Sequence, residues 1–153
     1  MTEVGKAAPP FSAPTDGGEN LSLKDLRGGK VVLYFYPKDD TPGCTKEAMA
    51  FTEHLAQFKK AGTVVVGISK DSPAKHDKFV AKHGLKVRLV SDEDGTICEK
   101  FGVWVEKSMY GRKYMGIERA TFLIDETGKI RQVWRKVKVP GHAEEVLAAA
   151  SSI

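Results

Sequence analysis

The sequence contains only two cysteines, Cys44 and Cys98, among its 153 residues. Two cysteines cannot form a disulfide scaffold, and in a reducing compartment both would remain free thiols. The longest apolar run, residues 31–36, is far shorter than the roughly 18 residues that a membrane-spanning helix needs. The N-terminal residues also lack the apolar block of a signal peptide. We therefore expect a cytoplasmic protein with no membrane association.

The sequence also lacks a strong excess of charge of either sign. Its 24 Lys and Arg residues against 20 Asp and Glu residues give a net charge of +4, with acidic residues interspersed among the basic ones. A solvated surface explains this pattern better than a nucleic-acid site does. Hydrophobic residues make up 41% and charged residues 29%, which excludes disorder, collagen and coiled coil. The length predicts one domain, residues 1–153, with its own core.

The apolar pattern predicts an α/β fold. Residues 30–36 form a nearly continuous apolar run, typical of a central strand covered on both faces. Helical spacing over 44–60 and a second buried strand over 63–69 predict a parallel pair of strands with a right-handed crossover. Further along we expect a helix over 73–83, a strand over 87–90, a helix over 92–101, a hairpin of strands 120–124 and 130–134, and a helix over 142–150, with 102–118 unassigned. The result is a mixed central sheet with helices on both faces, in the thioredoxin-like manner.

Cys44 lies where the central strand gives way to the first long helix. In open α/β sheets, the crevice beyond the carboxyl ends of the strands is the usual place for a reacting group. The first turn of a helix also has unpaired N–H groups and a partial positive charge, which favour a thiolate. Cys44 shares a helix face with Ala48, Phe51 and Leu55. We therefore expect its sulfur in the floor of a pocket.

A helix terminus alone cannot ionise a thiol at neutral pH. An ordinary thiol has a pKa of about 8.5, and lowering that value to about 6 takes roughly 3.4 kcal/mol. A helix end supplies ~0.3–1 kcal/mol, and about 2 kcal/mol at most. A cation must supply the rest, and arginine is the one that stays charged in a partly dry pocket. Arg119 leads the candidates because it directly precedes the apolar strand 120–124, whereas Arg112, Arg131 and Arg135 lie in polar or loop contexts.

The loop before Cys44 adds a hydroxyl and two prolines. Thr41 lies three residues before Cys44, at or near the N-cap position of the helix. Its hydroxyl could cap the helix, hydrogen-bond a substrate oxygen, or do both. Pro37 and Pro42 could stiffen the loop or shield the sulfur from water. The residues alone leave these alternatives open.

The run from Pro37 to Cys44 has the pattern Pro-x-x-x-Thr-x-x-Cys, which resembles the peroxiredoxins. The longer run FYPKDDTPGCTKEA is similar to the Q-type branch, the bacterioferritin comigratory protein group. The stretches SDEDG..CEKFGVW and YG..Y.GI.R.TFLID resemble the same branch, so the similarity extends over nearly the whole chain.

This resemblance implies a thiol-dependent peroxidase with a thioredoxin-like fold and an antioxidant role in cell redox homeostasis. Such an enzyme reduces hydrogen peroxide and organic hydroperoxides without a metal or an organic cofactor. By position, Cys44 matches the peroxidatic cysteine, Thr41 the hydroxyl that orients the peroxide, Pro37 the shielding proline and Arg119 the arginine that supports the thiolate. The thiolate would attack one peroxide oxygen and become a sulfenic acid.

The chain departs from the branch at the second cysteine. Many members carry one five residues after the first, but here Met49 occupies that position, so the usual disulfide within the helix cannot form. Residues 72–86, where some relatives place the cysteine instead, contain none. We interpret Cys98 as a small apolar residue on a short helix, with a resolving role as the alternative. We therefore expect a monomeric one-cysteine enzyme that is reduced by thioredoxin, glutaredoxin or glutathione.

Other functions fit the residues less well. A thioredoxin-type oxidoreductase needs Cys-x-x-Cys, and a cysteine hydrolase needs a histidine nearer to Cys44 than His54, about three turns away. His76, His83 and His142 lie in polar helices without metal-ligand spacing, so we expect all four histidines at the surface and no metal site. The alternative that remains open is a non-catalytic redox-sensing or binding module, in which the basic residues of 131–138 would face an anionic partner. Such residues on an edge strand more often discourage aggregation, so we expect no nucleic-acid partner.

Overall fold

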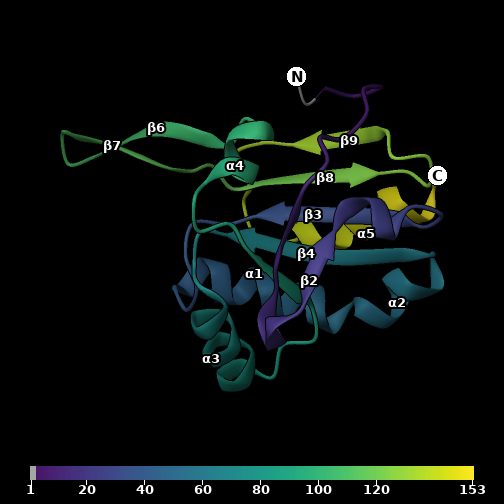
Figure 1. The fold of residues 1–153 in the computed structure, drawn as a ribbon, viewed down its shortest axis with the longest axis horizontal. Coiled ribbons are helices and arrows are strands. Elements are labelled where there is room, and N and C mark those ends of the chain that lie inside the picture. The colour runs from purple at the N-terminus through teal and green to yellow at the C-terminus, as the bar shows by residue number, and fades with distance from the viewer. Residues whose placement is uncertain (1–2) are drawn as a thin grey trace.

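A mixed sheet of five strands organises the fold, as Figure 1 shows. The computed structural model describes residues 3–153. The strand order is β5 (Arg88–Ser91), β4 (Thr63–Ser69), β3 (Lys30–Phe35), β8 (Ala120–Ile124) and β9 (Ile130–Trp134). The β3–β4 and β4–β5 pairs are parallel, and the β3–β8 and β8–β9 pairs are antiparallel. The expected mixed sheet and the central place of its first long strand are confirmed.

All six residues of β3 are buried, which explains its continuous apolar sequence. Because successive side chains of a strand point to opposite faces, β3 contributes to two cores. Val32 and Tyr34 pack on one face with Phe51. Leu33 and Phe35 pack on the other face with Phe101. The sheet therefore separates two hydrophobic cores.

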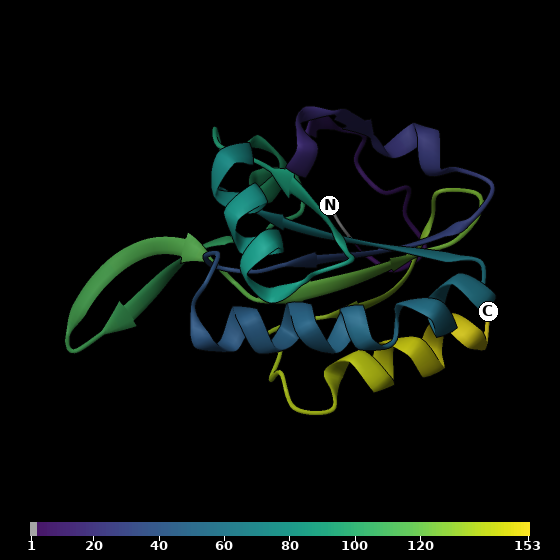
Figure 2. The ribbon, with the colours of Figure 1, turned by 90° about the horizontal axis from the view of Figure 1, so that it is seen from below.

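Helices cover both faces of the sheet, as expected (Figure 2). One face carries α1 (Pro42–Glu53), α2 (Leu55–Lys60) and α5 (His142–Ser151). The other face carries α4 (Thr96–Lys100) and the N-terminal segment, which contains β1 (Ser12–Pro14), β2 (Asn20–Ser22) and the short 3₁₀ helices η1 (Asp16–Gly18) and η2 (Leu23–Leu26). Helix α3 (Pro73–His83) packs against β5 at the edge of the sheet. Within the described residues, no helix combines the length and the apolar character needed to cross a membrane.

The single helix expected over 44–60 is wrong in two respects. It begins earlier, because Pro42 occupies the first turn of α1, where a proline has the required φ and needs no N–H partner. It also breaks at His54, which separates α1 from α2. The ring of His54 holds this break through hydrogen bonds with Gln57 and with Glu144 of α5.

Two other segments differ from their prediction. Helix α4 is shorter than the expected 92–101, because Asp92 stays outside it and accepts hydrogen bonds from the N–H groups of Ile97 and Cys98. The unassigned stretch 102–118 contains an antiparallel hairpin, β6 (Trp104–Met109) and β7 (Arg112–Ile117). This hairpin extends away from the rest of the molecule in both views (Figures 1 and 2). Its side chains are largely exposed, so it has little of the apolar signal that marks the buried strands.

Candidate active site

Cys44 is the third residue of α1, just beyond the carboxyl end of β3. Its side chain is only 1% exposed and packs in the same core as Ala48 and Phe51. The helix face that the sequence predicted to be buried is therefore the buried face. The sulfur lies beside the first turn of α1, where backbone N–H groups are free of helical partners.

Arg119, the residue just before the neighbouring strand β8, reaches Cys44. Its Nη2 lies 3.4 Å from the sulfur of Cys44 and donates a hydrogen bond to it. The register of the sheet explains this approach, because Ala120 of β8 pairs with Phe35, the last residue of β3. The residue before Ala120 therefore lies beside the loop that leads into α1. The position of Arg119 before a buried strand predicted it as the cation near Cys44. The structure places its guanidinium in contact with the sulfur.

Gly43 makes room for the guanidinium. A Cβ atom at this position would lie 3.2 Å from Nη2 of Arg119. That distance is tighter than ordinary packing, so a side chain here would require the guanidinium to shift by a few tenths of an ångström. Glycine at position 43 lets Arg119 lie where it does without that shift.

Glu47 is a site residue that the sequence reasoning missed. It lies one turn beyond Cys44 on α1, its side chain is 1% exposed, and its Oε1 is 2.6 Å from Nη1 of Arg119. Burial raises the pKa of Glu47 to about 7, and the Arg119 guanidinium opposes that rise. Burial also disfavours the charge of Arg119, but the charges of Glu47 and Cys44 outweigh it and raise the pKa of Arg119. An acidic residue on the apolar face of a helix, three positions after the cysteine, was the available signal.

Thr41 and Pro37 belong to the loop between β3 and α1. Thr41 occupies the N-cap position of α1, as expected, but its hydroxyl makes no capping hydrogen bond. Instead, its Oγ1 donates a hydrogen bond to the carbonyl oxygen of Lys38, 2.9 Å away. Pro37 lies two residues beyond β3, and its side chain is exposed. The roles of Thr41 toward peroxide and of Pro37 in shielding the sulfur stay predictions.

Cys98 lies on the opposite side of the sheet from Cys44. It is fully buried and packs in the core that contains Phe35 and Phe101, whereas Cys44 packs in the other core. Burial raises the pKa of the Cys98 thiol far above its usual range, and the neighbouring Asp92 raises it further. The prediction that Cys98 is a small apolar residue agrees with this position.

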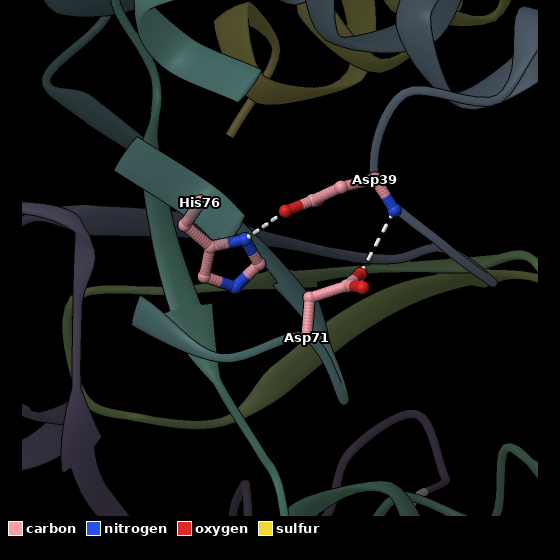
Figure 3. Close-up of side chains that lie close together, drawn as sticks. All are labelled: Asp39, Asp71 and His76. Carbon is pink, nitrogen blue, oxygen red and sulfur yellow. Dashed lines mark hydrogen bonds and ion pairs between the residues drawn. The ribbon is translucent and has the colours of Figure 1, made fainter. Parts of the chain in front are cut away.

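The expectation that all four histidines lie at the surface is wrong for two of them. His76 is completely buried in α3, and His142 is 4% exposed at the start of α5. His142 is within hydrogen-bonding distance of Thr121, and His76 contacts Asp39 in the loop that leads to Cys44. Figure 3 shows that His76, Asp39 and Asp71 come together from three separate segments. Because their spacing along the chain is irregular, no sequence motif marks them.

Comparisons with known proteins agree with one another. The family model of the AhpC/TSA family matches residues 4–133. A peroxiredoxin bcp from Coxiella burnetii is 61% identical over 145 residues, covering 95% of this chain and 96% of the relative. Peroxiredoxin Bcp from Bacillus subtilis is 47% identical over 145 residues, covering 95% and 92% of the two chains.

Solved structures give the same result. Peroxiredoxin Q from Xanthomonas campestris superposes with a TM-score of 0.89 at 48% identity, covering 93% of this chain and 90% of that one. A cysteine-to-serine variant of PrxQ from Xylella fastidiosa has a TM-score of 0.94 at 42% identity, covering 99% and 97% of the two chains. The predicted thioredoxin-like α/β fold and the Q-type resemblance are thereby confirmed.

Proposed function

This chain belongs to the AhpC/TSA family and is a peroxiredoxin, a thiol-dependent peroxidase, and we propose that Cys44 alone carries out its reaction with peroxide. The observation that supports this proposal most directly is the 3.4 Å contact between Nη2 of Arg119 and the buried sulfur of Cys44. A permanent cation at this distance stabilises negative charge on the reacting atoms. The ion pair with Glu47 keeps the guanidinium in position.

The proposed reaction begins with attack by the Cys44 thiolate on one oxygen of ROOH. A sulfur–oxygen bond forms while the oxygen–oxygen bond breaks, and the leaving RO⁻ takes up a proton to become ROH. Negative charge moves from sulfur to the leaving oxygen during this step. Arg119 already lies beside the reacting sulfur, so it stabilises that charge without reorganisation. The enzyme is left with a sulfenic acid on Cys44.

We propose both hydrogen peroxide and organic hydroperoxides as substrates. A solved Xanthomonas campestris bacterioferritin comigratory protein, 47% identical to this chain, is described by its alkyl peroxide reduction activity. In this chain, the hydroxyl of Thr41 and the first-turn N–H groups of α1 are the proposed donors to the peroxide oxygens. Pro37 is the proposed shield between the loop and water. No organic or metal cofactor takes part in this scheme.

The sulfenic acid is proposed to be cleared by an external thiol. The external thiol forms a mixed disulfide with Cys44 and releases water, and a second thiol then restores Cys44 and leaves as a disulfide. Met49 replaces the usual partner within the helix, and the sheet stands between Cys44 and Cys98. Thioredoxin, glutaredoxin and glutathione are the candidate reductants, and we propose that the enzyme works as a monomer in the cytoplasm.

Non-reducing mass spectrometry after one equivalent of peroxide tests the one-cysteine mechanism. We expect a gain of one oxygen atom on Cys44, trapped by a reagent that alkylates sulfenic acids. A Cys44–Cys98 disulfide with loss of two hydrogens would instead support the two-cysteine alternative. A modification of Cys44 without any peroxide turnover in the presence of thiols would support the redox-sensing alternative.

A further inference from the structure

A buried polar cluster ties the loop before Cys44 to α3 (Figure 3). Its members are Asp39 in the loop, Asp71 before α3 and His76 within α3, and all three are buried. The backbone N–H of Asp39 donates to Oδ2 of Asp71 at 2.8 Å, and Oδ2 of Asp39 lies 2.6 Å from Nδ1 of His76. Two parts of the same loop residue, its backbone and its side chain, are thus both held from the α3 side.

The hydrogen bonds of His76 determine where its protons lie. Its Nε2 is 3.0 Å from the carbonyl oxygen of Val90 in β5, which can only accept, so Nε2 carries a hydrogen. Its Nδ1 faces Oδ2 of Asp39 at 2.6 Å. The other oxygen of Asp39 accepts from the hydroxyl of Tyr36 at 2.6 Å. A nitrogen lone pair and a carboxylate oxygen repel at this distance, so a second proton lies between Nδ1 and Oδ2.

The cluster has the composition of a metal site, but its geometry suits a proton. Metal–ligand distances of ~2.0–2.2 Å to histidine nitrogen and carboxylate oxygen place two tetrahedral ligand atoms about 3.3 Å apart. The 2.6 Å between Nδ1 of His76 and Oδ2 of Asp39 is too short for that arrangement. It is the length of a strong charge-assisted hydrogen bond.

The loop that this cluster holds is strained. Asp40 has a φ of +60°, a conformation that residues other than glycine adopt only at an energetic cost. Asp40 lies between Asp39 and Thr41, the N-cap of α1. Its own carboxylate pairs with Lys82 and His83 of α3, but these contacts are exposed and contribute little. The buried contacts of Asp39, with Asp71, Tyr36 and His76, are therefore the main restraints on the loop, and the one with His76 is the only one of them that involves an imidazole.

We propose that His76 is a positioning residue for the peroxide reaction, which it serves by sharing a proton with Asp39 and so holding the loop 37–43 in its reactive conformation. This inference rests on the proposed function of Cys44. His76 touches neither the sulfur nor the peroxide. It acts through Asp39 on Thr41 and on the backbone that enters α1. Release of Asp39 would let the loop relax at Asp40 and would move the Thr41 hydroxyl away from the peroxide.

The proton-sharing contact between Asp39 and His76, here called the clamp, depends on pH in a direction set by the charged groups around His76. Burial by itself would lower the pKa of His76, but the hydrogen bond and charge of Asp39 outweigh it and raise the pKa, with Asp71 adding to the rise. Tyr36, the residue that follows β3, faces the pair, and only a backbone carbonyl faces it from β5. Lys75 and Lys78 of α3 line the open hollow of about 380 Å³ next to Asp39 and Asp71. Because the folded pKa lies above the ordinary value of 6.5, the clamp is complete below about pH 6.5 and opens as pH rises through the folded pKa.

Two substitutions of His76 and one control test the proposal. His76→Leu removes the shared proton at similar volume, and His76→Asn keeps a donor near the position of Nδ1 but cannot titrate. Lys82→Ala removes only an exposed contact between α3 and the same loop. For each protein, the rate constant of Cys44 with hydrogen peroxide is measured from pH 5 to pH 10. The rate of alkylation by iodoacetamide, which needs no peroxide site, is measured in parallel.

We expect His76→Leu to lower the peroxide rate constant by about tenfold or more while the alkylation rate stays within about twofold of wild type. His76→Asn should retain most of the wild-type peroxide rate below about pH 6.5 and lose the decline that wild type shows as pH rises through the folded pKa of His76. Lys82→Ala should match wild type throughout. Equal losses of both rates, a wild-type peroxide rate in His76→Leu, or an unchanged decline with rising pH in His76→Asn would each overturn the proposal.

The His76→Asn profile also decides the matter if His76→Leu does not fold. A wild-type protein whose Cys44 does not react rapidly with peroxide would contradict the proposed function itself. That result is separate from the outcomes above, all of which compare variants with a reactive wild type.

Discussion

Glu47 and Arg119 form a partly buried ion pair, with 2.6 Å between Oε1 and Nη1, and the same guanidinium contacts the reactive sulfur. The second oxygen of Glu47, Oε2, is also buried and has no hydrogen-bond partner within the described part of the chain. The carboxylate is therefore only half satisfied. Burial raises its pKa to about 7, so near neutral pH the pair lies between a charged and a protonated form.

Glu47→Gln should change how stability depends on pH. The pKa of Glu47 is about 7 in the folded protein, above the ordinary value of 4.5, so the folded state holds its proton more tightly than the unfolded state does. Its favourable contribution is complete below about pH 4.5 and is lost as pH rises to about 7. The free energy of unfolding of wild type should therefore fall relative to the glutamine variant by up to about 3 kcal/mol over this window.

Urea unfolding of both proteins at several pH values from 4 to 8 measures this difference. The difference between the two proteins is the informative quantity, because other carboxylates titrate equally in both. Wild type gaining stability over Glu47→Gln with rising pH would contradict the prediction. It would mean that attraction to Arg119 outweighs the burial of the carboxylate.

Arg119→Ala should remove most of the peroxide reactivity, by about 10²- to 10³-fold. Two effects combine: the cation that favours the thiolate is lost, and so is the group that stabilises the leaving oxygen. Arg119→Lys keeps the positive charge but loses the forked guanidinium that contacts Glu47 and Cys44 at once. Its peroxide reactivity should therefore lie between those of wild type and Arg119→Ala. Stopped-flow oxidation and the thiolate absorbance near 240 nm at pH 7 report the two effects separately. Unchanged thiolate absorbance in Arg119→Ala would remove the arginine from the role of supporting the anion.

Cys44→Ser should abolish peroxide consumption, whereas Cys98→Ser should keep most of it when an external thiol is supplied. The serine hydroxyl is not ionised near neutral pH and cannot replace the thiolate. Cys98 is fully buried in the core on the other side of the sheet, so its loss should leave the site intact. Peroxide consumption with glutathione or with thioredoxin and its reductase measures both variants. Loss of turnover in Cys98→Ser with the fold retained would refute the one-cysteine mechanism.

The buried strands were the most predictable part of the fold. Continuous apolar runs at 30–36 and 63–69 indicated the centre of the sheet because these segments, β3 and β4, are buried on both faces over most of their length. The β6–β7 hairpin left no comparable signal because most of its residues are exposed. The break at His54 was not predicted either, and one of the two contacts of its ring is with Glu144, ninety residues away. The limits of the domain, residues 1–153, stay a prediction.

The site was predictable as far as its residues are linked to local structure. Cys44 follows a central strand, and Arg119 precedes the antiparallel strand beside it. The positions of these strands therefore bring both residues to the same end of the sheet. The burial of Glu47 and His76 was not predicted because each is a polar residue whose partner lies far away in the sequence. The sequence of α3 is polar, which is typical of a helix at the surface. Only the folded structure shows that Asp39 lies opposite His76.

Met49→Cys tests whether this chain retains the capacity for the disulfide that its sequence lacks. Residues five apart on an α-helix point about 140° away from each other. Cys44 is 1% exposed while Met49 is 49% exposed, so the two side chains leave α1 on different sides. A disulfide needs the two Cα atoms within about 7 Å and their side chains turned together, which requires the first turns of α1 to unwind.

We expect Met49→Cys to convert its Cys44 sulfenic acid into an internal disulfide, with a loss of helical circular dichroism that thiol reductants reverse. Glu53→Cys is the matched control, because it places an exposed cysteine on α1 too far along the helix to reach Cys44. Mass spectrometry and circular dichroism after one equivalent of peroxide measure both variants. If Met49→Cys accumulates sulfenic acid as wild type does, the start of α1 does not unwind on oxidation. The one-cysteine mechanism would then reflect the rigidity of the helix as well as the missing thiol.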